Sequence, residues 1–297
     1  MFAGTGAVGR YFKPQVKSVI ANDLEYYSFV LNRHYIQNNT KLDSQEAFIE
    51  LNKLEPFEGF IFKNYSLGGR TERNYFSSNN AGKIDAIRSK LEYWKPQISE
   101  DLYFFLLASL LESADKIANT ASVYGAYLKH IKKTAAKNLI LKPSDIIETG
   151  GSHLVFHKDA NELIKDIKGD VLYLDPPYNA RQYGANYHLL NTIAKYEFFE
   201  PKGVTGLPEY NKSQYCSSKE VYSAFKGLLS NARFKHIFIS YNNEGLLSQD
   251  ELIGLLKEYG SVSVSAYKYN RFKADKTANR NHKAKETTEF LFYLRQR

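Results

Sequence analysis

Two consecutive prolines at the end of an apolar run constrain the fold of this chain more than any other feature. Val171–Asp175 reads as a short buried strand, and Pro176-Pro177 follow it directly. Proline has no backbone N–H and a fixed φ, so a central strand cannot continue here. Ligands of α/β sheets bind at the carboxyl ends of the strands, where this turn would lie. We therefore expect a binding site at Asp175–Tyr178, although a plain strand terminator with Asp175 as a cap would look similar.

Three other segments are strand candidates, rich in branched and aromatic residues and ended by polar turns. They are Val16–Asp23, His153–Asp159 and His236–Tyr241. Leu24–Gln37 carries apolar residues at helical spacing. Strands that alternate with helices predict an α/β fold with a parallel sheet and helices on both faces.

The end of the chain has a different pattern. Ser261–Tyr269 alternates polar and apolar residues, and Thr287–Tyr293 is a second apolar run, so we expect a terminal antiparallel hairpin. The basic stretch Lys268–Lys285 lies between them, with seven Lys/Arg residues and one acid, Asp275. Such a stretch attracts polyanions without specifying sequence. A solvated loop is the alternative interpretation.

A long segment, Glu55–Gly150, lies between the second and third strands of the predicted sheet. Amphipathic helical spacing appears at Asp101–Lys116 and at Tyr124–Lys137. Because the segment is too long for a simple loop, we interpret residues 55–150 as an inserted helical subdomain. Residues 1–54 and 151–297 would then form the main domain.

The first residues form a glycine-rich turn, Phe2–Gly9 (FAGTGAVG), and Asp23 ends the next strand. Glycines allow positive φ angles and let a ligand approach the backbone closely. Nucleotide-binding folds place an acid at such a strand end, where it binds ribose hydroxyls. A tight structural turn alone would show the same glycines; the pair of features favours a nucleoside-containing cofactor.

The order FAGTG, Asp23, Asp159 and DPPY resembles the Dam-like class of DNA adenine methyltransferases. The segments Asn179–His188 and Ser240–Asn242 and the terminal TEFLFYL resemble the subset found in bacterial restriction–modification systems. The resemblance implies a Rossmann-like sheet that binds S-adenosylmethionine, and a target-recognition role for the inserted subdomain. It implies double-stranded DNA as the substrate and a cognate restriction endonuclease as a candidate partner.

The resemblance also implies roles for individual residues. Asp175 and the carbonyl of Pro176, held rigid by Pro177, would accept the amine hydrogens of adenine, and Tyr178 would stack on the flipped base. The expected cofactor-binding residues are Phe2, Gly4, Gly6, Asp23, Asp159 and Asp175. The expected nucleic-acid contacts are Arg181, Gln182, Tyr183, Tyr187, His188, Arg271 and Lys273.

Several of these residues have a structural alternative. Asp159 could equally be a helix N-cap. The aromatic and polar residues after the DPPY turn are individually common in packing, and we favour a substrate role because they cluster there. Lys129, Tyr124 and Tyr127 belong either to the DNA face or to a helix stripe in the core.

The sequence departs from the family pattern at its start. Only Met1–Ala3 precede Gly4, which is too short for the strand that normally leads into the glycine-rich turn. A missing central strand would leave backbone groups of both neighbours without partners. We therefore expect an N-terminally incomplete chain.

Composition sets broad limits. One cysteine, Cys216, forms neither an internal disulfide nor a cysteine-based zinc site, and we expect no metal. No apolar run approaches the roughly 20 residues that cross a bilayer, and we expect no secretion signal. We expect a cytoplasmic monomer with no membrane association. A net charge of +8 suits a polyanionic partner.

Other functions share parts of this pattern. Some ribosomal-RNA methyltransferases that act on guanine amines use a similar turn, but they usually lack such an insertion. Cytosine-amine enzymes more often have serine in place of Asp175, and RNA-adenine or protein-glutamine enzymes have asparagine. A catalytically inactive DNA-binding remnant is the alternative from another class.

Overall fold

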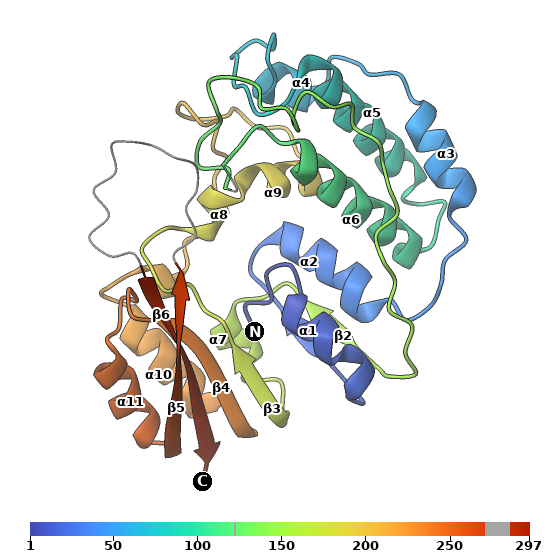
Figure 1. Cartoon of the computed structure of the whole chain (residues 1–297). Helices are drawn as coiled ribbons and strands as arrows, with labels where there is room; N and C mark the ends of the chain where they lie inside the picture. Colours follow the sequence, from blue (N-terminus) through green and yellow to red (C-terminus); the bar gives the residue numbers. More distant parts are fainter. Residues whose placement is uncertain (122, 271–285) are drawn as a thin grey trace.

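The computed structural model describes residues 1–121, 123–270 and 286–297. Its elements form a helical lobe and a sheet lobe, with the N-terminus between them (Figure 1). The predicted α/β class is confirmed. No helix of the described ranges is long and apolar enough to cross a membrane.

The strands form two separate sheets in the described part of the chain. Their bounds are β1 (Ile20–Asn22), β2 (Leu154–Phe156), β3 (Gly169–Leu174), β4 (Phe234–Asn242), β5 (Gly260–Asn270) and β6 (Glu286–Gln296). β1 and β2 pair in parallel, and the other sheet has the order β3-β4-β6-β5. β3 runs parallel to β4, and β6 pairs antiparallel with both β4 and β5. The terminal antiparallel hairpin is therefore confirmed, while the parallel strands lie in two sheets instead of one.

The N-terminal residues bridge the two sheets. Ala3 N donates to Asn22 O of β1 at 3.0 Å, and the Met1 amine donates to Tyr173 O of β3 at 3.0 Å. These bonds bring the glycine-rich turn close to the ends of both β1 and β3, so the two sheets contribute to one region.

The four-stranded sheet buries one face. On β3, Leu172 and Leu174 are buried, whereas Val171 is 56% exposed and Tyr173 is half-buried. The buried face packs on α10 (Val221–Asn231) and α11 (Gln249–Lys257), and each buried leucine contributes about 1.5–3 kcal/mol. This packing fixes the direction of β3 and hence the position of the turn that follows it.

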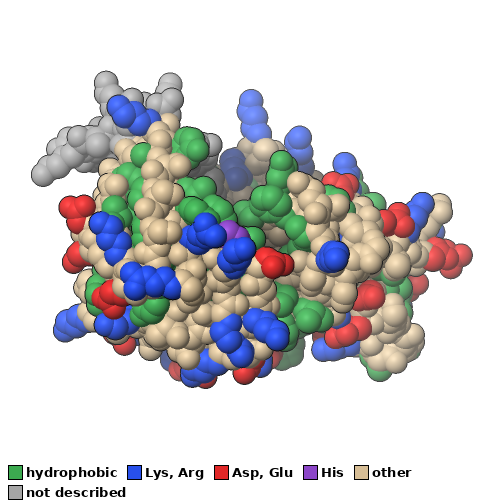
Figure 2. All heavy atoms as spheres, turned by 90° about the horizontal axis from the view of Figure 1, so that it is seen from below, with side chains coloured by type: hydrophobic (Ala, Val, Ile, Leu, Met, Phe, Trp, Pro, Cys, Tyr) green, Lys and Arg blue, Asp and Glu red, His purple; other side chains and the backbone are tan. Residues whose placement is uncertain are grey.

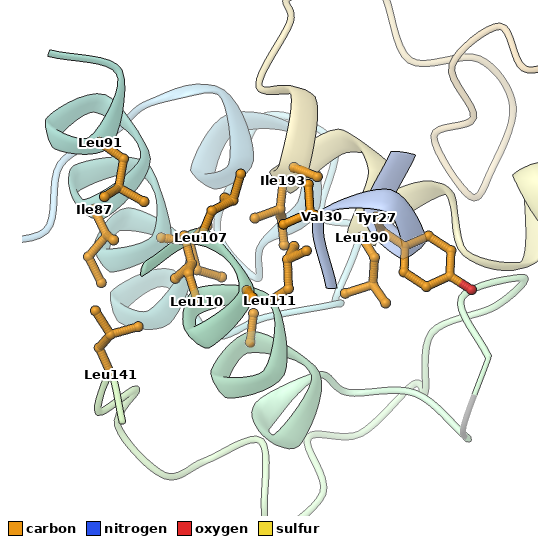
Figure 3. Close-up of a cluster of buried hydrophobic side chains, with 14 of the residues drawn as sticks. Tyr27, Val30, Ile87, Leu91, Leu107, Leu110, Leu111, Leu141, Leu190 and Ile193 are labelled. Atoms are coloured by element: carbon orange, nitrogen blue, oxygen red, sulfur yellow. The ribbon is translucent and has the colours of Figure 1, made fainter. Parts of the chain in front are cut away.

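The helical lobe has one shared hydrophobic core. Its main helices are α2 (Tyr26–Asn32), α3 (Gln45–Lys53), α4 (Phe60–Tyr65), α5 (Ser78–Trp94), α6 (Glu100–Ile117) and α9 (His188–Lys195). Figure 3 shows Val30 of α2 and Ile193 of α9 among leucines of α6. The helices of residues 55–150 therefore share their core with α2 and α9, which flank that range in the sequence.

The smaller helical elements connect these layers. They are α1 (Ala7–Phe12), η1 (Lys13–Gln15), η2 (Arg33–Gln37), α7 (Ala160–Leu163), α8 (Tyr183–Asn186) and η3 (Gln214–Cys216). α2 and η2 together confirm the helix expected at Leu24–Gln37.

The helix predicted at Asp101–Lys116 is confirmed by α6, and its ends follow simple rules. The Ser99 side chain accepts a hydrogen bond from Leu102 N at 3.2 Å and caps the first turn. Glu100 and Asp101 lie in the first turn and Lys116 lies in the last. Each charge is thus near the end of the helix dipole that has the opposite sign, which stabilises the helix.

The helix predicted at Tyr124–Lys137 is wrong, because these residues form turns and bends. They belong to a longer irregular stretch, residues 119–144, that we call the anchored segment. Buried asparagine side chains hold its backbone. Asn119 donates to Leu128 O and to Asn74 O, each at 2.9 Å, and accepts from Lys132 N at 3.0 Å.

Two asparagines from the helices continue this pattern. Asn80 of α5 donates to Lys137 O and accepts from Leu139 N, each at 2.8 Å. Asn52 of α3 bonds both backbone groups of Leu141 at 2.9 Å. The anchored segment thus satisfies much of its backbone through side chains of the lobe, which a periodicity pattern cannot reveal.

We predict that Asn119→Leu destabilises the protein by about 2–4 kcal/mol, because backbone groups at positions 74, 128 and 132 lose a buried partner. Chemical denaturation measures the loss, and limited proteolysis should show new cleavage within the anchored segment. Asn211→Leu, at an exposed position, is the control and should change stability little. Equal stability of the two variants would contradict the prediction.

Candidate active site

The turn Asp175–Tyr178 leaves the sheet at the carboxyl end of β3, as predicted. Leu174, the last residue of β3, is in register with Ile239 of β4. Pro176 and Pro177 are buried, so the turn is rigid and its carbonyls have fixed directions. Tyr178 O accepts from Leu246 N at 2.8 Å, which ties the turn to the loop after β4.

The Asp175 carboxylate lies in an unfavourable electrostatic setting. It is reached by solvent, yet the surrounding protein removes enough water to raise its pKa to about 6. The charge of Glu289 raises the pKa further, whereas the Met1 amine and a hydrogen bond from Ser240 lower it. The carboxylate is therefore ionised at neutral pH and can accept hydrogen bonds, and it becomes protonated when the pH falls through about 6.

The glycine-rich turn is held by three side chains. Gly4 N donates to Asp23 Oδ2 at 2.8 Å. Gly4 O accepts from Ser28 Oγ at 2.5 Å and from Asn32 Nδ2 at 3.1 Å, both on α2. Because the backbone N–H and C=O of Gly4 are both hydrogen-bonded, the turn has one defined conformation.

Three residues of this turn have the left-handed backbone conformation that favours glycine. Gly4 and Gly6 have φ of 54° and 78°, and Phe2 has φ of 58°. A Cβ on Gly4 would meet open space, whereas one on Gly6 would lie 2.7 Å from Asn32 Oδ1. The Phe2 ring packs edge-on against Tyr215 with centroids 4.8 Å apart. The open side of Gly4 is the side on which a ligand could approach.

Asp23 is the acid expected at the end of β1, and its Oδ2 accepts the hydrogen bond from Gly4 N. Its other oxygen, Oδ1, accepts from Glu25 N at 2.9 Å. Burial raises the pKa of Asp23, and the bonds from the Glu25 and Gly4 amides oppose that shift. Burial also raises the pKa of Glu25 to about 7.

A cavity of about 420 Å³ is lined by Glu25. Its lining also includes Leu24 after β1 and His157 after β2, and most of its other residues lie between 191 and 211. The cavity therefore adjoins the segments that follow β1 and β2, whereas Asp23 and Asp175 do not line it.

Asp159 acts as a helix N-cap, which was the alternative interpretation. Its Oδ1 accepts from Asn161 N at 2.8 Å and from Glu162 N at 3.3 Å at the start of α7. Both bonds go to one oxygen, and the residue lies in the short connection between β2 and α7. The observed role of Asp159 is therefore the structural one.

The residues after the Asp175–Tyr178 turn differ in how far solvent reaches them. Arg181 is exposed and Tyr183 is 36% exposed. Gln182 is used internally, since its side chain accepts from Ser213 N at 2.8 Å. Tyr187 is half-buried against Tyr183, with ring centroids 5.8 Å apart. Arg181 and Tyr183 are therefore the members of this group that a ligand can reach most easily.

His188 does not face solvent. It is fully buried, and its Nε2 lies 3.2 Å from Tyr124 O and 3.4 Å from the Tyr75 hydroxyl. Burial lowers its pKa to about 4, so the ring is neutral. Its position gives no support to the expected DNA contact. Arg271 and Lys273 lie outside the described residues.

Two residues that hold the site were missed by sequence reasoning. Ser28 and Asn32 are four residues apart on α2, so they lie on the same helix face toward Gly4. Small polar residues at this spacing, directly after Asp23, were a signal that could have been found. Ser240, which bonds Asp175, appeared only as part of a motif.

Comparisons with known proteins show which family the sequence matches. Residues 1–254 match the model of the D12 class N6 adenine-specific DNA methyltransferase family. The chain is 56% identical to Type II methyltransferase M.NlaIII of Neisseria lactamica, over 99% of this chain and 89% of that protein. It is 42% identical to Type II methyltransferase M.CviAII of Paramecium bursaria Chlorella virus 1, over 99% of this chain and 88% of the relative. Type II methyltransferase M.FokI of Planomicrobium okeanokoites is 40% identical, over the whole chain but 48% of its own length. No solved structure matches significantly.

We predict that Gly6→Ala lowers the free energy of unfolding by about 1–3 kcal/mol, because the new methyl group would press on Asn32 in a left-handed conformation. Gly254→Ala is the matched control, since its Cβ would meet open space within α11. That change should be neutral or slightly stabilising. Denaturant unfolding compares the two, and similar midpoints would exclude a strained turn.

Proposed function

The chain belongs to the D12 class of N6 adenine-specific DNA methyltransferases, and we propose that it methylates a flipped adenine within a short DNA sequence as the modification enzyme of a restriction–modification system. The observation that carries the detailed proposal is the Asp175–Tyr178 turn, whose ionised carboxylate lies beside the clamped glycine-rich turn. Those are the two parts that amino-group methylation needs.

The cofactor of the proposed reaction is S-adenosylmethionine, which supplies an electrophilic methyl group on a sulfonium. The residues fit it, because the open side of Gly4 gives access to the backbone and the half-buried Asp23 carboxylate suits ribose hydroxyls. Phe2, Gly6 and Asp159 would complete this site.

The catalytic turn would activate the adenine amine. The lone pair of this nitrogen is delocalised into the ring, so the amine is a weak nucleophile. Asp175 and the carbonyl of Pro176 would each accept one amine hydrogen, which directs the lone pair away from the ring. The buried prolines fix both acceptors before the positive charge develops.

The target base must leave the duplex to reach this turn. Tyr178 would stack on the flipped adenine. Arg181 and Tyr183, the accessible residues that follow, would contact phosphate or the flipped adenosine, with Gln182 and Tyr187 supporting them. We omit His188 from this set because it lies in the core.

The inserted region 55–150 would recognise the target sequence, and residues 1–54 and 151–297 would perform the transfer. The similar Type II enzymes support a cognate restriction endonuclease in the same cell. We propose that the enzyme acts on double-stranded DNA as a cytoplasmic monomer.

Replacing the catalytic carboxylate tests the mechanism. Asp175→Ala should reduce the single-turnover methylation rate by at least about 10²–10³-fold, because a fixed acceptor for developing charge is lost. Binding of duplex DNA should change little. Asp170→Asn, an exposed position on the same strand, is the control. Near-normal turnover of Asp175→Ala would remove this residue from its role.

The pH dependence provides a second test. Protonated Asp175 cannot accept from the amine, so the rate should fall as pH falls through about 6, toward tenfold per pH unit below it. An unperturbed carboxyl would place this fall near pH 4. Single-turnover rates between pH 5 and 8 measure the profile; a flat profile down to pH 5 would contradict the proposed role of the carboxylate.

The substrate is tested by mapping modified bases in cells that express the protein. N6-methyladenine confined to one short DNA motif is the expected result. Methylation found only in ribosomal RNA would favour the guanine-amine alternative. DNA binding without S-adenosylmethionine binding would indicate an inactive remnant.

A further inference from the structure

The anchored segment has a charge pattern that the proposed chemistry does not use. Residues 119–144 contain five lysines and no Asp or Glu. Lys129, Lys133 and Lys137 are exposed, whereas Lys132 donates to Thr120 O at 2.8 Å. On the face seen in Figure 2, basic and acidic side chains are mixed. A run of one sign is therefore not a general property of this surface.

The lysines are presented by a backbone that is fixed in place. Tyr124, Ala135, Leu139 and Leu141 of the segment are buried in or against the lobe. With these residues inside and the backbone bonded to buried asparagines such as Asn80, the exposed lysines have defined positions. A loop kept only for solubility would not need these buried polar bonds.

The anchored segment also contacts the elements after the catalytic turn. Tyr124 N donates to Asn186 O of α8 at 2.8 Å. Tyr124 O accepts from the Tyr75 hydroxyl at 2.8 Å and lies 3.2 Å from His188 Nε2 of α9. Figure 1 shows the green trace leaving α6, passing near α8 and α9 and returning to β2. The anchored segment therefore packs directly on the two helices that follow the Asp175–Tyr178 turn.

We propose that Lys129, Lys133 and Lys137 bind phosphates of the DNA that flanks the target adenine, independently of its sequence. The inference rests on the proposed function, since it identifies the polyanion as duplex DNA. Lysine ammonium groups suit single phosphates, because they are compact charges without the planar geometry that reads base edges. Their fixed backbone reduces the entropy lost when the DNA binds.

Counterion release gives the proposal a quantitative form. Each phosphate neutralised by a lysine contributes about 0.9 to the slope of log affinity against log salt concentration. Removing three contacts should reduce that slope by about 2–3 and weaken binding about ten- to a hundredfold near physiological salt.

The experiment compares two triple variants with the same charge change. Lys129→Ala/Lys133→Ala/Lys137→Ala removes the proposed contacts. Lys168→Ala/Lys235→Ala/Lys257→Ala removes three exposed lysines of the sheet lobe. Affinity for a duplex containing the mapped motif is measured between about 50 and 200 mM salt. S-adenosylmethionine affinity, the methylation rate at saturating DNA and thermal unfolding are measured in parallel.

The expected result is a reduced slope for the first variant alone, with the three parallel measurements unchanged and the same loss on DNA without the motif. Replacing the same lysines by arginine should restore the slope, because the charge returns. A slope equal to that of the unmodified protein would overturn the proposal. Loss confined to motif-containing DNA would also overturn it, since the lysines would then read bases.

These outcomes are separable from failure of the proposed function. If the unmodified protein does not methylate DNA, the proposed function itself fails. If the unmodified protein methylates DNA and the first variant keeps its salt slope, only the phosphate-binding inference fails. Binding of an acidic protein by the same lysines, with DNA affinity unaffected, would count against it equally.

Discussion

The side chain of Asn191 connects the segment after β1 to the helix that follows the Asp175–Tyr178 turn. Its Oδ1 accepts from Tyr27 N at 2.9 Å, and its Nδ2 donates to Glu25 at 2.5 Å. Glu25 lies two residues after Asp23, and Asn191 belongs to α9. These bonds join the start of α2 to α9, and buried side chains of both helices pack with those of α5 and α6 in one hydrophobic core.

Local chemistry accounts for the parts of the structure that were predictable. The strand end at Leu174 follows from two prolines, and α6 follows from a serine cap with charges of the right sign at each end. The glycine-rich turn and Asp23 were expected to lie together, and the hydrogen bond from Gly4 N to Asp23 joins them. Each of these features depends on residues that are close together in the sequence.

The parts that could not be predicted depend on distant partners. Apolar spacing at 124–137 suggested a helix, but Asn80 and Asn119 provide hydrogen bonds that an irregular backbone can use. His188 follows the catalytic turn in sequence, yet Tyr75 and Tyr124 enclose it in the core. The split of the parallel strands into two sheets is likewise a property of the pairing and not of any one strand.

The order of the larger sheet has a consequence for local opening. β4 and β6 each have a neighbour on both sides, whereas β3 is at the end of the order β3-β4-β6-β5 in the described ranges. Amide protons in β4 and β6 should therefore exchange with solvent only through large-scale unfolding, and outward-facing amides of β3 through smaller fluctuations. The same holds for β5 at the other end of this order. The strand that leads into the Asp175–Tyr178 turn is thus one of the two edge strands of the sheet, while the prolines that follow it have no amide proton to exchange.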